Sequence, residues 1–212
     1  MNINKTIDHT YLKADAGEKE IKRICKETLK YGFRSVCINP EWASLAKKEL
    51  KGKALVVTVI DWPCGAGSIN ARVFEAKQAK KDGADEIDPV IKIGKLKEGK
   101  YAEVLNDLKK LSKILPTKVI IETGFLSEKE IIKASKIVKK SGAICVKTST
   151  GLPPKVEIDK KIKHVKLMRK AVGPKYLVKA AGGIRTLKDV EKMLKAGADI
   201  IGTSGSVSIV KK

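Results

Sequence analysis

The sequence predicts a single α/β domain built around a parallel sheet. Short runs rich in β-branched residues alternate along the chain with longer amphipathic segments, which is the pattern of repeated βα units. Most of the short runs are apolar at nearly every position, as expected of parallel strands that are buried on both faces. The 212 residues contain no linker or low-complexity tract. We therefore expect residues 1–212 to form one domain around one core.

Seven segments are clearly predicted as strands, and an eighth is a short segment close to the N-terminus. The clear strands are expected at residues 35–39, 54–60, 86–91, 119–123, 144–148, 176–180 and 199–203, and the eighth at 6–10. Eight βα units would close a barrel, whereas seven or fewer would leave an open, doubly wound sheet. The pattern itself leaves both architectures open.

The segments between the strands are predicted as helices with one apolar face and a lysine-rich opposite face. Apolar residues recur three and four positions apart in residues 21–29 and 101–115. The boundaries agree with this reading, because Ser127 and Glu130 form a capping-box pattern and Gly173 and Gly197 stand where helices end.

Composition argues against several classes of function. The formal net charge is +21, but the basic residues are spread over nearly every amphipathic segment and aromatic residues make up only 4% of the chain. Such a chain lacks a base-stacking platform, so we expect no nucleic-acid partner. The abundance of Lys and Glu resembles the bias of thermophile proteins.

Targeting signals and metal motifs are also missing from the pattern. No apolar run approaches the roughly 18 to 20 residues of a membrane span, and the first residues lack the apolar core of a signal peptide. The four cysteines form no CxxC pair, and there are only two histidines. We therefore expect a cytoplasmic protein with reduced thiols, no metal, no cofactor and no membrane partner.

Polar residues gather at the predicted carboxyl ends of the strands, where parallel α/β folds bind their ligands. The strand ends carry Asp8, Cys37, Asp88, Glu122, Lys147 and Lys179. This clustering predicts a site at that edge of the sheet.

Two of these residues are lysines that end consecutive strands. Burial and a cationic neighbour both lower the pKa of a lysine, and an amine with a pKa near about 7 to 8 is a nucleophile at neutral pH. Lys147 and Lys179 are therefore candidates for covalent chemistry. The plainer alternative is a lysine whose stem packs in the strand while its amine reaches water. Asp88, which shares a strand face with Glu86, is either a proton-relay carboxylate or a structural partner of a buried lysine.

Glycine-containing turns follow the last two strands and predict an anion site. The turns are Ala180–Gly183 and Gly202–Ser206, at the usual phosphate-binding position of such barrels. His9 and Glu122 are more simply explained as polar residues near this edge whose hydrogen bonds are satisfied, and Arg185 as a residue that caps the sheet or pairs with an acid.

Seven motifs in order along the chain resemble those of deoxyribose-phosphate aldolases, a class I (Schiff-base) family. They are IDHTYLK from Ile7, VCINP from Val36, EIDPVIKIGKLKEGKY from Glu86, KVIIETG from Lys118, VKTSTG from Val146, VKAAGGIRT from Val178 and GADIIGTSGS from Gly197. The resemblance spans nearly the whole chain. It implies a (β/α)8 TIM barrel that reversibly cleaves 2-deoxyribose 5-phosphate to glyceraldehyde 3-phosphate and acetaldehyde.

The resemblance also implies a role for each matching residue. Lys147 would form the Schiff base, Lys179 would adjust its pKa and move protons, and Asp88 would relay protons with Lys179. Substrate would contact Asp8, Cys37 and Thr148, and its phosphate would be held by Gly151, Gly182, Gly183, Ser204 and Gly205.

The chain departs from the family pattern at several positions. Gly205 and Ser206 replace a serine and a glycine in the phosphate turn, Asp61-Trp62 replaces Gly-Phe, and Lys92 stands where Asn is common. These changes bear on pocket shape and aldehyde preference.

Alternative functions remain open at this stage. They are a Schiff-base aldolase for another phosphosugar, a barrel that binds phosphate without catalysis, and a basic nucleic-acid-binding protein. A homodimer or homotetramer is expected.

Overall fold

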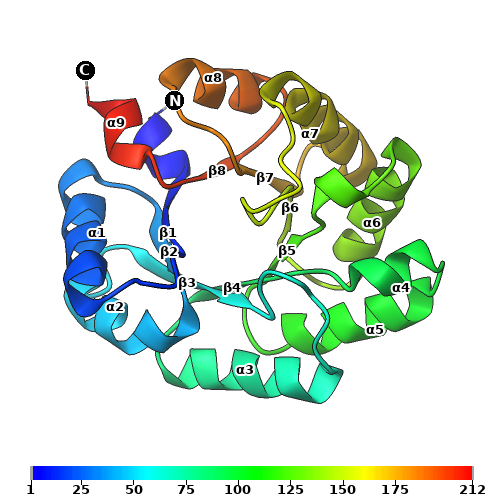
Figure 1. Ribbon diagram of the computed structural model, residues 1–212, viewed down its shortest axis with the longest axis horizontal. Helices are drawn as coiled ribbons and strands as arrows, with labels where there is room; N and C mark the ends of the chain where they lie inside the picture. Colours follow the sequence, from blue (N-terminus) through cyan, green and yellow to red (C-terminus); the bar gives the residue numbers. More distant parts are fainter. Residues whose placement is uncertain (1, 212) are drawn as a thin grey trace.

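The computed structural model describes residues 2–211 as a ring of strands enclosed by helices (Figure 1). The strands are β1 (Ile7–Tyr11), β2 (Ser35–Ile38), β3 (Leu55–Ile60), β4 (Glu86–Pro89), β5 (Lys118–Ile120), β6 (Cys145–Lys147), β7 (Leu177–Ala181) and β8 (Ile200–Thr203). All ladders between neighbouring strands are parallel. The short N-terminal segment is thus a true strand, and β1 lies between β2 and β8.

The ring closes between β4 and β5. These strands are joined by two isolated parallel bridges, Ile87 to Thr117 and Val90 to Ile120, and the Ile91 N–H donates to the Ile120 carbonyl at 2.8 Å. Eight strands therefore form a barrel, which decides between the two architectures that the sequence left open.

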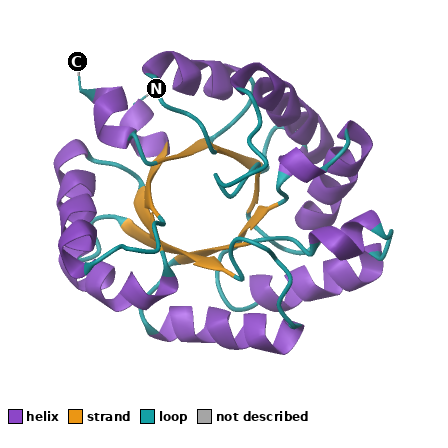
Figure 2. Ribbon diagram, in the orientation of Figure 1, coloured by secondary structure: helices purple, strands orange, loops and turns teal. Residues whose placement is uncertain are grey.

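Helices cover the outside of the ring (Figure 2). They are α1 (Glu18–Tyr31), α2 (Ala43–Leu50), α3 (Ile69–Lys81), α4 (Ile93–Lys97), α5 (Tyr101–Ser112), α6 (Glu128–Lys140), α7 (Ile158–Val172), α8 (Leu187–Lys195) and α9 (Ser206–Val210). Short 3-10 turns lie at η1 (Ile3–Thr6), η2 (Pro40–Trp42) and η3 (Thr123–Phe125). The capping box predicted from Ser127 and Glu130 is confirmed at the start of α6.

Two strands end at least two residues earlier than the sequence pattern predicts, and each has a backbone reason. β4 ends at Pro89 rather than at residue 91, because proline has no N–H to donate to the next strand. β5 ends at Ile120 rather than at residue 123, because Glu122 has φ 47° and turns the chain into η3.

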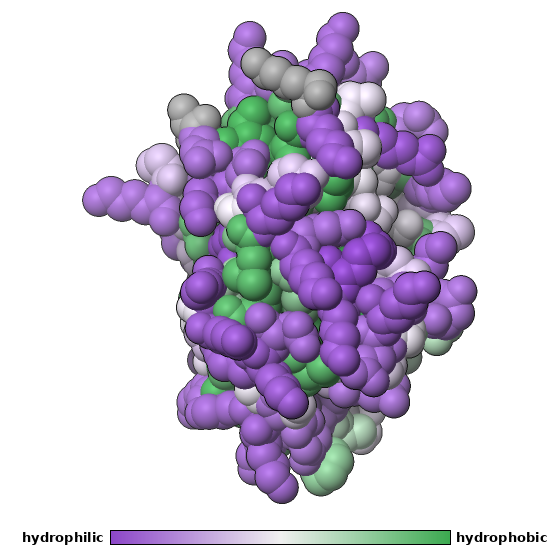
Figure 3. All heavy atoms as spheres, turned by 90° about the vertical axis from the view of Figure 1, so that its left-hand side faces the viewer, coloured by the Kyte–Doolittle hydropathy of each residue, from purple (hydrophilic) through white to green (hydrophobic). Residues whose placement is uncertain are grey.

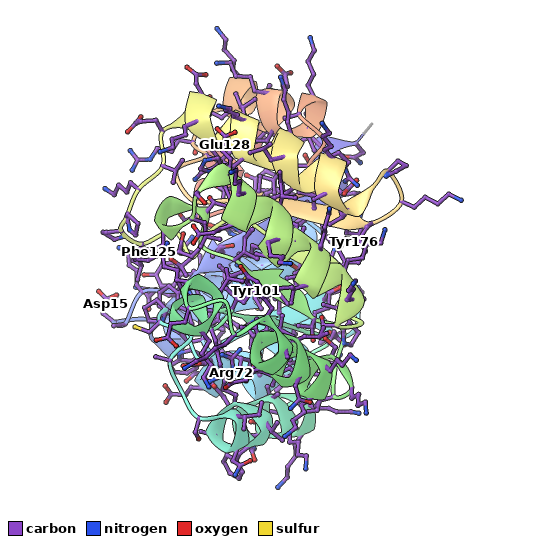
Figure 4. The ribbon with its side chains drawn as sticks, turned by 90° about the vertical axis from the view of Figure 1, so that its right-hand side faces the viewer. Asp15, Arg72, Tyr101, Phe125, Glu128 and Tyr176 are labelled. Atoms are coloured by element: carbon purple, nitrogen blue, oxygen red, sulfur yellow. The ribbon has the colours of Figure 1, made fainter. Side chains whose placement is uncertain are left out.

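Loops that follow the strands lie at one end of the barrel. Figure 4 shows Asp15 and Phe125, which follow β1 and β5, at one end of the molecule and Tyr176, which precedes β7, at the other. We call the first end the mouth. The loop after β6 projects over the middle of the ring (Figure 1).

The outer surface is strongly polar. On the side that carries α1 and α2, hydrophilic residues cover most of the face, with apolar side chains visible between them (Figure 3). This agrees with lysines that occupy the solvent side of amphipathic helices. Within residues 2–211, every helix is too short or too polar to cross a membrane.

Candidate active site

The two lysines singled out in the sequence converge inside the barrel. Lys147 and Lys179 are paired residues of the β6–β7 ladder, so their side chains leave the same face of adjacent strands. Both amines donate to the same carboxylate oxygen, Oδ2 of Asp88, each at 2.8 Å. The strand register therefore assembles three chemically reactive groups that are 32 to 91 residues apart in sequence.

Lys179 is fully buried and firmly held as a cation. Its amine also donates to Oδ2 of Asp8 at 2.6 Å. Burial lowers the pKa of Lys179, but the Asp8 and Asp88 carboxylates outweigh it and raise that pKa well above its ordinary value. The sequence-based expectation of a lowered pKa is thus wrong for this member of the pair, because two carboxylates surround it. Gly202 leaves space for the Lys179 side chain, since a Cβ at this position would lie 3.1 Å from Cε of Lys179.

Asp88 is the carboxylate at the centre of the cluster. Burial raises its pKa, but Lys118, Lys147 and Lys179 together hold the pKa of Asp88 well below its ordinary value. Lys118 lies 2.9 Å from the second oxygen, Oδ1. Asp88 is therefore an ionised carboxylate that accepts hydrogen bonds from two ammonium groups and forms an ion pair with a third, Lys118, a contact that sequence reasoning missed.

The cluster continues toward the far end of the barrel through Glu86. Lys118 forms an ion pair with Glu86, and Arg34 bridges Glu86 and Asp8 with one nitrogen 2.9 Å from each. Ser35 donates to Asp8 at 2.7 Å. Arg34 was also missed, because its side chain reaches inward from the start of β2.

The seven charged side chains form one network in which cations exceed carboxylates. Its cations are Arg34, Lys118, Lys147 and Lys179, and its carboxylates are Asp8, Glu86 and Asp88. The loss of one proton from an amine would leave the network neutral. Lys147 is the member whose side chain also lines the hollow at the mouth, so it is the amine that a substrate can reach.

This hollow has a volume of about 530 Å³, enough for a phosphosugar. Among the predicted site residues, its wall includes Lys147, Gly151, Gly182, Gly183 and Ser204.

The other predicted site residues do not line this hollow. They are Asp8, Cys37, Asp88, Thr148, Lys179 and Gly205. Asp8 is buried beside Lys179. Cys37 is buried in a cluster against which Leu12 and Trp62 pack, and these two residues line the hollow. Contact of Asp8 and Cys37 with substrate stays a prediction.

The glycine turns stand together at one side of the hollow. Gly182 and Gly183 have φ angles of +82° and +74°, which favour glycine. A Cβ on Gly182 would approach Cα of Gly151 to 3.2 Å, so the turns after β6 and β7 pack closely. These turns and Ser204 line the same wall, with Arg185 beside them.

The altered turn after β8 does not restore a hydroxyl to the wall. Ser206 is fully buried, its Oγ is 2.9 Å from Nδ1 of His9, and it donates to the Thr203 carbonyl at 3.0 Å. Nε2 of His9 is in turn 2.8 Å from Glu27. Ser206 thus contacts β1 directly and α1 through His9. His9 is buried, and both of its ring nitrogens have hydrogen-bond partners.

Two other residues shape the mouth without joining the charged network. Glu122 accepts a hydrogen bond from the Thr150 N–H at 2.8 Å, which holds the loop after Lys147. Asp61 accepts from the Gly67 N–H at 3.0 Å and from Arg72 at 3.1 Å, so this departure from the family pattern anchors the loop after β3. Its neighbour Trp62 forms part of the wall.

Over residues 2–211, the structure holds no cluster of three or more His, Cys, Asp or Glu side chains placed to bind a metal ion.

Comparison with known proteins gives the family. The family model described as "DeoC/LacD family aldolase" matches residues 3–209. This chain belongs to that family. A deoxyribose-phosphate aldolase of Mycoplasmopsis pulmonis is 46% identical over 100% of this chain and 96% of its own length. One of Thermococcus gammatolerans is 47% identical over 100% and 96%.

Solved structures of the family superpose closely. An aldolase called QR15 has a TM-score of 0.92 at 38% identity, covering 98% of this chain and 93% of its own. A deoxyribose-phosphate aldolase from Aeropyrum pernix, described as having a unique tetrameric structure, has a TM-score of 0.86 at 30% identity, with 98% and 88% covered.

Proposed function

We propose that this DeoC/LacD aldolase cleaves 2-deoxyribose 5-phosphate reversibly to glyceraldehyde 3-phosphate and acetaldehyde through a Schiff base on Lys147. The observation that carries the proposal is the position of Lys147. Its amine contacts Asp88 at 2.8 Å and lines the hollow that also exposes the glycine turns. The named relatives and the family match support the same activity.

Lys147 supplies the covalent step. Its unprotonated amine attacks C1 of the open-chain sugar, and uptake of one proton with loss of water gives a protonated imine. The C3 hydroxyl then loses its proton and the C2–C3 bond breaks, with the electron pair moving to C2 to form an enamine. C3 becomes the aldehyde of glyceraldehyde 3-phosphate. Protonation at C2 and hydrolysis of the imine release acetaldehyde and restore the amine.

Lys179 and Asp88 donate and accept protons beneath the reacting carbon atoms of the substrate. Asp88 accepts hydrogen bonds from both amines through one oxygen, so it connects the imine nitrogen with a buried ammonium. Lys179 stays cationic between Asp8 and Asp88. It offers a positive charge and a proton close to the imine without competing as a nucleophile.

The phosphate is assigned to the glycine turns. Gly182 and Gly183 line the same hollow as Lys147, together with Gly151 and Ser204 on the same wall, and we assign the phosphoryl oxygens to the backbone N–H groups of this wall. Such turns accept phosphate because no Cβ blocks the approach. The other predicted binding residues act from below or behind the wall of the hollow. They are Asp8, Cys37, Thr148 and Gly205.

We place its action in the cytoplasm, on free phosphosugar and aldehydes, without nucleic acid. Three of the four cysteines are buried and all four are free thiols, which suits a reducing compartment. A homodimer or homotetramer is proposed, supported by the tetramer named for the Aeropyrum pernix relative.

The experiment is a cleavage assay with 2-deoxyribose 5-phosphate that measures both aldehyde products. Wild type is expected to release them in equal amounts, Lys147→Met to be inactive, and the exposed-lysine control Lys188→Met to match wild type. Cleavage of a longer phosphosugar but not of deoxyribose phosphate would contradict the proposed substrate. Full activity in Lys147→Met would contradict the mechanism.

A further inference from the structure

Lys161 is a buried lysine that the proposed mechanism does not use. It lies in the first turn of α7 and is only 2% exposed. Its amine donates to the carbonyl of Ala181 at 2.9 Å and to the carbonyl of Gly182. Within residues 2–211 no carboxylate lies within 4.0 Å of this amine. Because burying a lysine is costly, these two carbonyls are the groups that compensate it.

The two carbonyls belong to the peptide units that carry the N–H groups of Gly182 and Gly183. A trans peptide is planar, and its N–H points away from its C=O. Fixing both carbonyl oxygens on Lys161 therefore directs both N–H groups to the opposite side. Both glycines line the hollow that holds Lys147, and across the described residues 2–211 neither N–H donates a hydrogen bond within the protein.

We propose that Lys161 is a positioning residue for the substrate phosphate: its ammonium orients and polarises the two glycine peptide units whose N–H groups bind the phosphoryl oxygens. The inference rests on the proposed function and deepens it. A charged donor strengthens the dipole of each peptide it contacts, so the opposite N–H becomes a better donor to an anion.

The surroundings of Lys161 hold it in this place. Thr148 supplies a second anchor, because its Oγ donates to the Ala181 carbonyl at 3.1 Å and accepts from the Ala181 N–H at 3.0 Å. A Cβ on Gly182 would stand 3.2 Å from Nζ of Lys161. The amine thus sits directly behind the turn, with no space between them for another group.

Lys161 keeps its charge at neutral pH. Burial lowers its pKa to about 8, opposed by Glu122 and Glu157. Lys161 also lines a second, smaller hollow, whose wall includes Lys155 from the loop before α7 and Arg185 from the loop after β7. The ammonium form therefore dominates near pH 7 and is lost as the pH rises through about 8.

The test compares Lys161→Met with Lys160→Met, its exposed neighbour in the same helix. For each variant, kcat/KM is measured with 2-deoxyribose 5-phosphate and with unphosphorylated 2-deoxyribose. The ratio of the two values is expected to fall about ten-fold in Lys161→Met, through KM, because a charged hydrogen-bond donor is lost. It should stay at the wild-type value in Lys160→Met. An unchanged ratio in Lys161→Met, or an equal fall with both sugars, overturns the proposal.

Inorganic phosphate gives a readout that does not depend on cleavage. Its dissociation constant, measured by calorimetry at pH 7, is expected to rise about ten-fold in Lys161→Met and not in Lys160→Met. If wild type cleaves neither sugar but this difference holds, the proposed function fails and the role of Lys161 stands. Equal phosphate affinity in the two variants overturns that role.

A measurement on wild type covers the case in which Lys161→Met does not fold. The amide resonances of Gly182 and Gly183 are followed by NMR between pH 6.5 and 9.5, together with Cε of Lys161. The two amides are expected to shift with the same midpoint as Lys161, near pH 8. Amide resonances that do not shift with the midpoint of the Lys161 titration overturn the proposal.

Discussion

Replacing Asp88 with asparagine tests the buried charge network most severely. The substitution keeps the size of the side chain but removes the negative charge that faces Lys147 at 2.8 Å, Lys179 at 2.8 Å and Lys118 at 2.9 Å. Four cations would then share two carboxylates inside the barrel. Breaking a buried ion pair by removing one partner costs about 3 to 5 kcal/mol, and we expect the free energy of unfolding of Asp88→Asn to fall by about that amount.

The assay is urea unfolding at pH 7 followed by circular dichroism, with cleavage rates measured on the folded variant. Activity is expected to fall at least about 100-fold, because proton transfer near the imine is impaired. Asp15→Asn, a change at an exposed carboxylate near the mouth, is the matched control and should alter neither quantity. A stability loss below about 1 kcal/mol in Asp88→Asn would refute the account of a network held together by this carboxylate.

Three further predictions follow from the same contacts. The pKa values of Asp8 and Asp88 are lowered in the fold, so their stabilisation is complete above the ordinary carboxyl value of 3.8 and is lost as the pH falls below it. Urea titrations should show a fall of about 1.4 kcal/mol per pH unit for each group, and a flat profile would contradict this. Lys179→Leu should slow cleavage at least about 100-fold and also lower the unfolding free energy, because it removes the one buried cation that hydrogen-bonds both Asp8 and Asp88 among residues 2–211; near-normal turnover would remove Lys179 from the mechanism. Gly182→Ala should cost about 1 to 2 kcal/mol in thermal unfolding, because of its positive φ and its contacts at 3.2 Å. Gly205→Ala, where a Cβ meets nothing closer than 3.4 Å, should be tolerated, and equal losses in the two variants would argue against the packing described.

The sequence predicted the barrel strands and the upper part of the site because both depend on local pattern. Continuous apolar runs marked the strands, and polar residues at their carboxyl ends marked the mouth. Lys147 and Lys179 could be paired in advance, since consecutive parallel strands carry them at matching positions. The boundaries of β4 and β5 were missed where Pro89 and Glu122 impose their own backbone geometry.

The lower part of the network could not be read from local pattern. Lys118 stands at the start of β5 and Arg34 just before β2, where charged residues are usually solvated, and only ring closure turns both inward. Lys161 did leave a signal. It occupies the buried stripe of α7 with Val165, Met168 and Val172, spaced four, seven and eleven residues along. A lysine on an apolar stripe in a lysine-rich helix is easily overlooked.

Cys37 shows a different limit. Its strand position predicted a place at the mouth, but whether a side chain at a strand end reaches the wall depends on what folds over it. Leu12 and Trp62 come from the loops after β1 and β3 and pack against the buried cluster that contains Cys37. Loop conformation of this kind is set by tertiary packing rather than by periodicity.

Reductive trapping tests the central claim most directly. Wild-type protein is incubated with 2-deoxyribose 5-phosphate or acetaldehyde, reduced with borohydride, digested and sequenced by mass spectrometry. An imine on Lys147 predicts a stable secondary amine on that residue, in stoichiometric amount, and none in Lys147→Met. An adduct on Lys179 or on a surface lysine instead, or no adduct from a protein that still cleaves the sugar, would contradict the account.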